Sequence, residues 1–258
     1  MEKINVIKVG GAVVEDQQQL SLLLKEFSAI EGRKVLVHGG GRRATKVASQ
    51  LGIETQMVDG RRITDKAMLE VVTMVYGGLV NKNVVAQLQA EGINALGLTG
   101  ADINVIRSHK RPLKNGIDYG FVGDVDHADG NMLKTLIEAG IVPVMAPLTH
   151  DGKGNMLNTN ADTIASETAK ALAPYYDVTL TFCFEKKGVL ANPDDDDSVI
   201  PVITPQLFRK YVADGTISGG MMPKIENSLA ALNAGVKQVV ITKADTLGSQ
   251  TGTKILAE

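Results

Sequence analysis

The amino-acid sequence predicts an α/β protein whose mainly parallel central sheet is covered by helices on both faces. Short apolar runs alternate along the chain with longer segments of helical spacing, the pattern of parallel strands joined by helical crossovers. Hydrophobic residues make up 44% of the 258 residues, enough to bury a large core. Glycine-rich segments directly follow the first two apolar runs, as tight strand-to-helix turns require. We therefore expect a three-layer αβα sandwich.

The predicted elements follow from these runs. The expected strands are Ile4–Val9, Lys34–His38, Ala95–Leu98, Ile141–Pro147, Val178–Phe184 and Gln238–Thr242. The expected helices are Gln17–Ala29, Ala44–Leu51, Asp65–Tyr76, Leu133–Ala139, Ala161–Leu172 and Pro223–Ala234. Ligands of such sheets bind beyond the carboxyl ends of the strands, so the loops that follow the strands are the candidate site.

The sequence contains no low-complexity linker, and the segment Ala173–Tyr176 is the best candidate for a boundary between two lobes. We expect one domain with an N-terminal lobe, residues 1–173, and a C-terminal lobe, residues 174–258. A net charge of −2 gives no reason to expect nucleic acid or a membrane as partner. No apolar window is long enough to span a membrane and no signal peptide is recognisable, so a cytoplasmic protein is expected.

The lone cysteine, Cys183, lies in an apolar run and excludes an intrachain disulfide. Buried filler is its favoured interpretation over a nucleophile. The acidic run Asp194–Asp197 follows an Asn-Pro pair and is interpreted as a solvated turn rather than a metal site. The segment Asp65–Tyr76 has almost no polar face, so the helix it forms is expected to be buried all round, either against a second subunit or deep in a monomer.

Two glycine loops carry the first chemical signal. They are Lys8–Gly11, after the first strand, and His38–Gly41, after the second. Glycines let backbone N–H groups approach an anion closely, and a lysine beside them supplies a point charge for phosphate. Neither loop has the spacing of a P-loop or of a dinucleotide-binding fingerprint. Each also fits a plain tight turn, and together they favour phosphate chemistry.

Polar residues at other loop ends add to this signal. Arg62, just before a helix, suits bidentate capture of a carboxylate, or is a solvated surface arginine. Asn158, Asn160 and Asp162 alternate in an extended segment, and one of them would suffice as a helix cap. Lys224 is expected at a helix N-terminus, where the dipole disfavours a cation, so a bound anion is expected nearby.

Taken together, these segments resemble the amino-acid kinase family over nearly the whole chain. Lys-x-Gly-Gly alone fits several members, including carbamate, aspartate and uridylate kinases. The pair Arg-x-Thr-Asp and Asn-x-Asn-Ala-Asp resembles more specifically the branch that phosphorylates N-acetylglutamate. The matching segments are Lys8–Gly11, His38–Gly41, Arg62–Asp65, Asn158–Asp162, Gly220–Lys224 and Gly252–Thr253.

The resemblance implies a role for each matching position. Lys8 and Lys224 would stabilise the transferring phosphoryl group, and Asp162 would orient both lysines. The residues expected to bind the acylated amino acid in the N-terminal lobe are Gly40, Gly41, Arg62, Asn158 and Asn160. The residues expected to bind the nucleotide, mainly in the C-terminal lobe, are Gly10, Gly11, Glu185, Gly188, Leu190, Ile217 and Met221.

The implied reaction moves the γ-phosphoryl group of ATP, with Mg²⁺ carried by the nucleotide, onto the γ-carboxylate of N-acetyl-L-glutamate, a step of arginine biosynthesis. That carboxylate is ionised at pH 7, so no general base is needed to create the nucleophile. Phosphoryl transfer then depends on alignment and charge stabilisation, and no protein-bound metal is expected. The alternatives are N-succinylglutamate as acceptor, with Arg42, Arg43 or Arg61 reaching the acyl end, and a non-catalytic amino-acid or nucleotide sensor. The family usually has Asp at the position of Glu185 and Pro after the glycine loop, where this chain has Arg42.

A homodimer built partly on the helix Asp65–Tyr76 is also expected. The family members that arginine inhibits carry an extra N-terminal helix. Here the first predicted strand begins near Ile4, so we expect a dimer that arginine does not inhibit.

Overall fold

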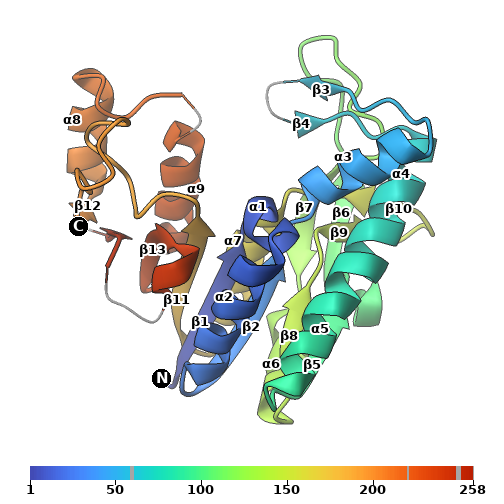
Figure 1. Cartoon of the computed structure of the whole chain (residues 1–258), viewed down its shortest axis with the longest axis horizontal. Coiled ribbons are helices and arrows are strands. Elements are labelled where there is room, and N and C mark those ends of the chain that lie inside the picture. The colour runs from blue at the N-terminus through green and yellow to red at the C-terminus, as the bar shows by residue number, and fades with distance from the viewer. Residues whose placement is uncertain (59–60, 220, 248–250, 258) are drawn as a thin grey trace.

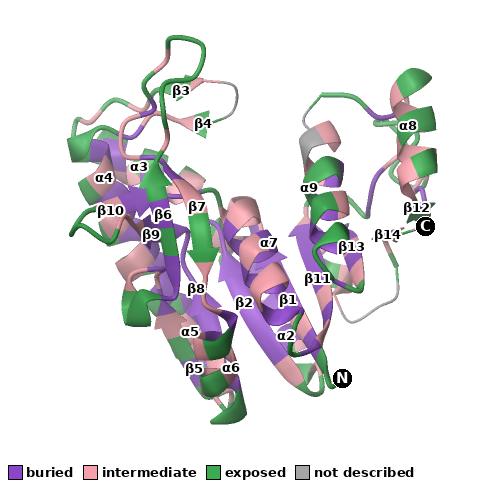
Figure 2. Cartoon of the chain, turned by 180° about the vertical axis from the view of Figure 1, so that it is seen from behind, coloured by how far each residue is buried: buried purple, intermediate pink, exposed green. Residues whose placement is uncertain are grey.

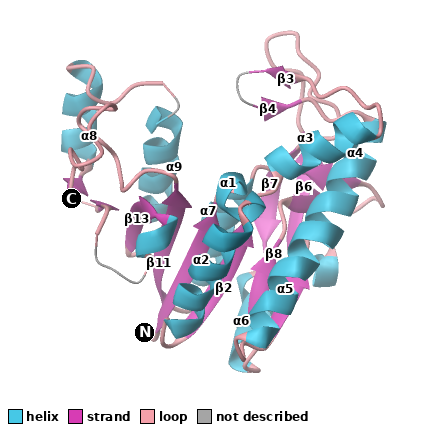
Figure 3. Cartoon of the chain, viewed as in Figure 1, coloured by secondary structure: helices cyan, strands magenta, loops and turns pink. Residues whose placement is uncertain are grey.

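The computed structural model describes residues 1–58, 61–219, 221–247 and 251–257. Its centre is one large sheet with helices on both faces (Figures 1 and 3). In order across the sheet, the strands are β12 (Val202–Ile203), β14 (Thr253–Ile255), β13 (Gln238–Lys243), β11 (Asp177–Phe184), β1 (Lys3–Val9), β2 (Arg33–His38), β8 (Val142–Met145) and β5 (Ala95–Leu98).

Strand pairing confirms the mainly parallel sheet. Within the described residues, β13 and β14 pair antiparallel, and the other pairings of this sheet are parallel. Val9 at the end of β1 is in register with His38 of β2 and Cys183 of β11. The loops that follow these three strands therefore leave the sheet at one edge, where a ligand site is expected.

Two hydrophobic clusters, one on each face of the sheet, form the core. Ile4 and Val6 of β1 belong to one cluster, and Ile7 and Val9 to the other, because side chains alternate along a strand. Figure 2 shows that the strands between the helical layers are the most buried part of the chain. One face carries α6 (Gly130–Glu138), α7 (Ala161–Leu172), α8 (Pro205–Ala213) and α9 (Met221–Asn233). The opposite face carries α1 (Gly11–Glu15), α2 (Gln17–Ala29), α3 (Gly41–Gln50), α4 (Lys66–Val72), η1 (Thr73–Val80) and α5 (Asn81–Ala90).

Two smaller sheets lie beyond the carboxyl edge of the large sheet, on the side of the first 173 residues (Figure 1). The four-stranded sheet has the order β10 (Met156–Asn158), β9 (Leu148–His150), β6 (Ile106–Lys110) and β7 (Gly123–Ala128). A hairpin joins β3 (Met57–Val58) to β4 (Arg61–Arg62), and short 3₁₀ turns occupy η2 (Asp102–Asn104) and η3 (Ala244–Thr246). The small sheets were absent from the expected elements.

The predicted helix Asp65–Tyr76 needs correction. Asp65 is its N-cap, accepting a hydrogen bond from the Met68 N–H, but the helical chain continues through the π-helix η1 and α5 to Ala90. The helix is not buried all round, because Met74 is 56% exposed and Leu79, in the extension, is 41% exposed. A single exposed apolar side chain is common on protein surfaces. Two on the same π-helical segment form an exposed apolar patch, which is typical of an interaction surface.

The large sheet is continuous across the predicted boundary between the two lobes, at residues 173 and 174. Residues 1–173 supply β1, β2, β5 and β8, residues 174–258 supply β11 to β14, and the two sets meet where β1 pairs with β11. Cys183 is fully buried, as predicted, and burial raises the pKa of its thiol to about 12. No helix among the described residues is both long and apolar enough to cross a membrane.

Candidate active site

A cavity of about 550 Å³ opens at the carboxyl edge of β1, β2 and β11. Most of the residues predicted for the site line it, although they come from distant parts of the sequence. They are Lys8, Gly10, Gly11, Gly40, Gly41, Arg62, Asn158, Asn160, Asp162, Glu185, Gly188, Met221 and Lys224. Gly220, which precedes Met221 in the matching segment, lies outside the described residues.

Two of the residues predicted to bind the nucleotide do not line this cavity. Ile217 packs in the hydrophobic core and is 2% exposed. Leu190 is half-buried and pairs with Val199 in an isolated bridge. Their assignment rested on the resemblance alone and remains a prediction.

The two glycine loops contact each other backbone to backbone. The Gly39 N–H donates to the Val9 carbonyl over 2.9 Å, which ties the second loop to the end of β1. A Cβ on Gly39 would lie 2.9 Å from the Gly11 nitrogen, and one on Gly40 would lie 2.8 Å from the Tyr76 ring. Only glycine fits at these approaches, so the loops form one rigid floor under the cavity.

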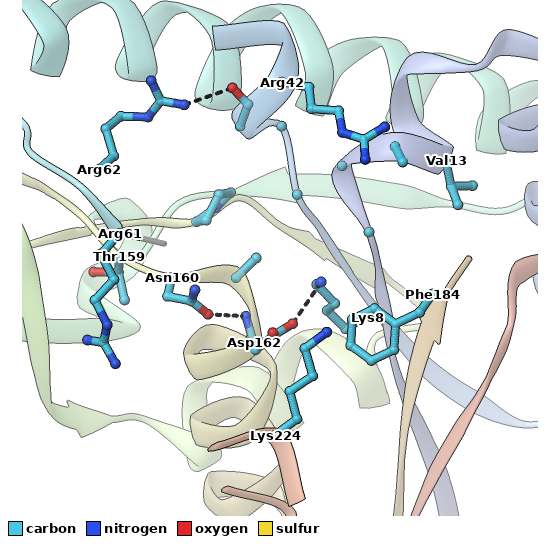
Figure 4. Close-up of a pocket in the computed structure, with 18 of the residues that line it drawn as sticks. Lys8, Val13, Arg42, Arg61, Arg62, Thr159, Asn160, Asp162, Phe184 and Lys224 are labelled. Carbon is cyan, nitrogen blue, oxygen red and sulfur yellow. Dashed lines mark hydrogen bonds and ion pairs between the residues drawn. The ribbon is translucent and has the colours of Figure 1, made fainter. Parts of the chain in front are cut away.

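One end of the cavity carries a cluster of charged side chains (Figure 4). Lys8 Nζ lies 2.7 Å from Asp162 Oδ1, and both side chains are largely buried. Asp162 lies in the first turn of α7, where the helix dipole favours a carboxylate. Lys224 reaches the same place from the first turn of α9. The structure therefore brings together the three residues predicted to act on the phosphoryl group.

Burial lowers the pKa of the Lys224 ammonium. The carboxylates of Asp162 and Glu185 oppose that shift, and the positive charge of Lys8 adds to it. The two carboxylates therefore stabilise the charged form of this partly buried ammonium group. Such a site is suited to receive the negative oxygens of a phosphoryl group.

The opposite end of the cavity is formed by Arg62, which lies in β4. Its Nη2 donates to the Gly41 carbonyl and to Thr45 Oγ1, each over 2.9 Å, and its Nη1 donates to Thr55 over 3.3 Å. These bonds fix the guanidinium beside the glycine floor. A planar guanidinium held in this way suits capture of a carboxylate.

The two matching segments that are most specific to the family branch meet in space. Asn158 Nδ2 donates to Thr64 Oγ1 over 2.9 Å, although 94 residues separate them in the sequence. Asn160 caps α7, because its side chain accepts from the N–H groups of Asp162 and Thr163. The cap interpretation is therefore correct for Asn160. Asn158 has a different task, which is to join the end of β10 to the segment just before α4.

Glu185 lies on the other rim, after β11. Its Oε1 accepts from Arg42 Nη2 over 3.0 Å, and both side chains are exposed. Lys186 and Lys187 pair with Asp196 and Asp197, so the acidic run is a turn held by ion pairs. These pairs confirm the turn interpretation. Arg42, one of the arginines considered for the acyl end, lines the cavity and pairs with Glu185.

Several lining residues were missed at the sequence level. Tyr76 supports Gly40, and burial raises the pKa of its phenol while Arg62 opposes that shift. Arg111 lines the cavity and holds the pKa of Asp124 below its usual value through their hydrogen bonds. The ring of Phe184 faces both lysines. Two of these three are aromatic residues in apolar runs, which look like core in a sequence.

Known proteins resemble this chain in sequence and in fold. The sequence profile described as the amino acid kinase family matches residues 3–243. Over 254 residues the chain is 68% identical to acetylglutamate kinase of Bacteroides thetaiotaomicron and 67% identical to that of Phocaeicola vulgatus, and each match covers 98% of both chains. Among solved structures, the smu.665 protein of Streptococcus mutans superposes with a TM-score of 0.79 at 31% identity, covering 99% of both chains. The chain therefore belongs to the amino acid kinase family.

Proposed function

We propose that the protein phosphorylates the γ-carboxylate of N-acetyl-L-glutamate with ATP, a step of arginine biosynthesis. The observation that carries this proposal is the shape of one cavity, with Lys8, Lys224 and Asp162 at one end and the fixed guanidinium of Arg62 at the other. The high identity to proteins named acetylglutamate kinase supports the same acceptor.

In this proposal, Arg62 binds the α-carboxylate and the glycine floor orients the acylated amino acid. The γ-carboxylate is then an ionised nucleophile pointing toward the lysines, so alignment and charge stabilisation supply the catalysis. Lys8 and Lys224 neutralise the charge that develops on the transferring phosphoryl oxygens. Asp162 holds Lys8 in place and balances the positive charge of the pair.

The nucleotide is proposed to enter from the side of residues 174–258, which supply Lys224, Glu185 and Gly188 to the cavity. Residues 1–173 would then hold the acylated amino acid. Among the described residues, no group of three or more His, Cys, Asp or Glu side chains is placed to hold a metal ion. We therefore propose that Mg²⁺ arrives as part of the nucleotide complex.

A coupled assay of ADP release tests the acceptor. The protein is given ATP with glutamate, N-acetylglutamate or N-succinylglutamate in turn. The proposal expects the highest kcat/KM with N-acetylglutamate and little turnover of free glutamate, whose α-amine is charged and lacks the acyl group. Tight binding of the ligands without any turnover would favour a non-catalytic sensor.

Replacing Arg62 with alanine is expected to raise the KM for N-acetylglutamate by about tenfold or more, because a charge-assisted bond to a carboxylate contributes roughly 1.5–3 kcal/mol. The KM for ATP is expected to change little, since Arg62 lies at the far end from Lys224 (Figure 4). Steady-state kinetics with each substrate varied separately measures both constants. A defect confined to ATP use would show that Arg62 serves the other ligand.

N-succinylglutamate is a second candidate acceptor, because two further arginines line the cavity at its Arg62 end. They are Arg61 and Arg111, and both lower the pKa of Asp124, Arg111 through its hydrogen bonds and Arg61 through its charge. A succinyl carboxylate needs such a cation, because an unpaired charge in a closed site is costly.

Arg61→Ala is therefore expected to depress kcat/KM for N-succinylglutamate by about tenfold, with the acetyl substrate nearly untouched. Arg43→Ala is the matched control, since Arg43 lies on α3 outside the cavity lining. Equal losses on both substrates, or no turnover of the succinyl compound by the unmodified protein, would remove this candidate.

We propose a homodimer that uses the exposed apolar face of η1, with Met74 and Leu79 at its centre. Burying these side chains against a second copy removes apolar surface from water. Light scattering of the unmodified protein is expected to give the mass of a dimer. The double variant Met74→Glu and Leu79→Glu is expected to give the mass of a monomer. A monomeric unmodified protein, or a dimer that both charges leave intact, would contradict this interface.

A further inference from the structure

Phe184, the last residue of β11, presents its ring to the ammonium groups of both lysines of the site. Lys224 Nζ lies 3.6 Å from the ring centroid and Lys8 Nζ lies 4.9 Å from it (Figure 4). The face of an aromatic ring carries negative potential and attracts a cation within about 6 Å. One ring is therefore shared between the two positive groups that the proposed reaction needs.

The site has a charge imbalance that this ring offsets. Asp162 forms an ion pair with Lys8 and also acts on Lys224, so one carboxylate serves two ammonium groups. Lys224 is half-buried, and the charged groups that act on it are Asp162, Lys8 and Glu185. Glu185 is itself exposed and engaged with Arg42. A polarisable ring directly beneath the ammonium adds attraction where the carboxylates are already occupied.

A second aromatic side chain, Phe182, holds the Phe184 ring in position. Phe184 stacks on Phe182 with centroids 6.0 Å apart and ring planes 10° from parallel. Phe182 is 3% exposed and belongs to the core cluster. The ring is thus held by the sheet rather than by a mobile loop, which is what preorganisation of a catalytic cation requires.

We infer that Phe184 is a positioning residue for phosphoryl transfer: its ring face holds the Lys224 ammonium beside Asp162 before the phosphoryl group arrives. This inference rests on the proposed kinase function. This role was not predictable from the amino-acid sequence, because an aromatic residue that ends an apolar strand resembles core filler. A cation–ring contact in a partly desolvated site accounts for about a tenfold change in rate. Phe184→Leu is expected to lower kcat by that factor and to leave the KM for N-acetylglutamate nearly unchanged.

Fluorinated phenylalanines separate the electrostatic role of the ring from its packing. Phenylalanine with one, two or three ring fluorines keeps nearly the same shape, while each fluorine weakens the negative potential of the face. With these residues at position 184, log kcat is expected to fall stepwise with fluorine number. The same series at Phe182 is the matched control and is expected to be flat, because Phe182 is in none of the cation–ring contacts among the described residues. A flat series at Phe184, or equal declines at both positions, would overturn the inference.

A second readout does not need turnover. Acetic anhydride labels a lysine only through its free amine, and peptide mass spectrometry can quantify labelling of Lys224 against the exposed Lys46. Because the ring stabilises the ammonium form, fluorination at position 184 is expected to increase the relative labelling of Lys224. Unchanged labelling across the series would contradict the contact. A protein that turns over no N-acylglutamate but still shows the labelling trend would refute the proposed function and leave the Phe184–Lys224 contact standing.

Discussion

Replacing Lys8 or Lys224 with alanine is expected to lower kcat by about 10²–10³, the scale for losing one group that stabilises the transition state. Both ammonium groups lie at the end of the cavity where the phosphoryl group is proposed to bind, and Lys8 Nζ lies 2.7 Å from Asp162 Oδ1 there. Because the lysines act on charge that develops during transfer, the KM values are expected to change much less than kcat. Steady-state kinetics of ADP release gives both constants.

The lysine prediction has two controls. Lys46→Ala removes an exposed lysine of α3 and is expected to leave kcat unchanged. Methionine in place of Lys8 or Lys224 keeps the apolar stem, so a loss of rate with retained thermal stability separates charge from packing. A near-normal kcat in either alanine variant would remove that lysine from the mechanism.

Acidification is expected to destabilise the protein through His38, by roughly 2 kcal/mol between pH 7 and pH 5. His38 is fully buried, and burial lowers its pKa to about 4. Its Nδ1 donates to the Gly39 carbonyl over 2.8 Å, while Asn81 Nδ2 lies 3.1 Å from Nε2. A carbonyl only accepts, so Nδ1 carries the proton and Nε2 accepts from Asn81, which is the neutral ring.

The sign follows from the two pKa values. The unfolded chain binds a proton near pH 6.5 and the folded chain only near pH 4, so the stabilisation is complete above 6.5 and is lost as the pH falls between these values. Urea unfolding at several pH values measures it, with His38→Gln as the variant that cannot titrate. If the free energy of unfolding changed with pH equally in the two proteins, the assignment to His38 would be wrong. If the variant does not fold, the NMR titration of His38 in the unmodified protein decides, and a folded-state pKa near 6.5 would refute it.

The central sheet was predictable because its strands are buried on both faces and stand out as apolar runs. The helices α2 and α7 have the bounds that helical spacing predicted. The small four-stranded sheet was not predictable in this way. In β6 the buried residues Ile106 and Ser108 are separated by the exposed Arg107, and in β7 every residue after Gly123 is half-buried or exposed. Both strands therefore resemble loops in a single sequence. The strands β12 and β14 are too short to give any pattern.

The site was predictable where charge, glycine or a cap marks it. Lys8, Asp162 and Lys224 meet as expected, and the Asn158–Thr64 bond explains why two distant segments occur together. The aromatic members Tyr76 and Phe184 were missed, because an aromatic residue in an apolar segment carries no sign of the charged groups it will contact. Those groups come from other elements, and only the fold brings them together.

Trapping the product tests the central claim most directly. The protein is incubated with ATP, Mg²⁺, N-acetylglutamate and hydroxylamine, which converts an acyl phosphate to a stable hydroxamate. The proposed reaction predicts the γ-hydroxamate of N-acetylglutamate in equal amount to the ADP released, and none with N-acetylglutamine, whose γ-carboxylate is replaced by an amide. Release of ADP without hydroxamate, or the same release with N-acetylglutamine, would contradict phosphoryl transfer to the γ-carboxylate.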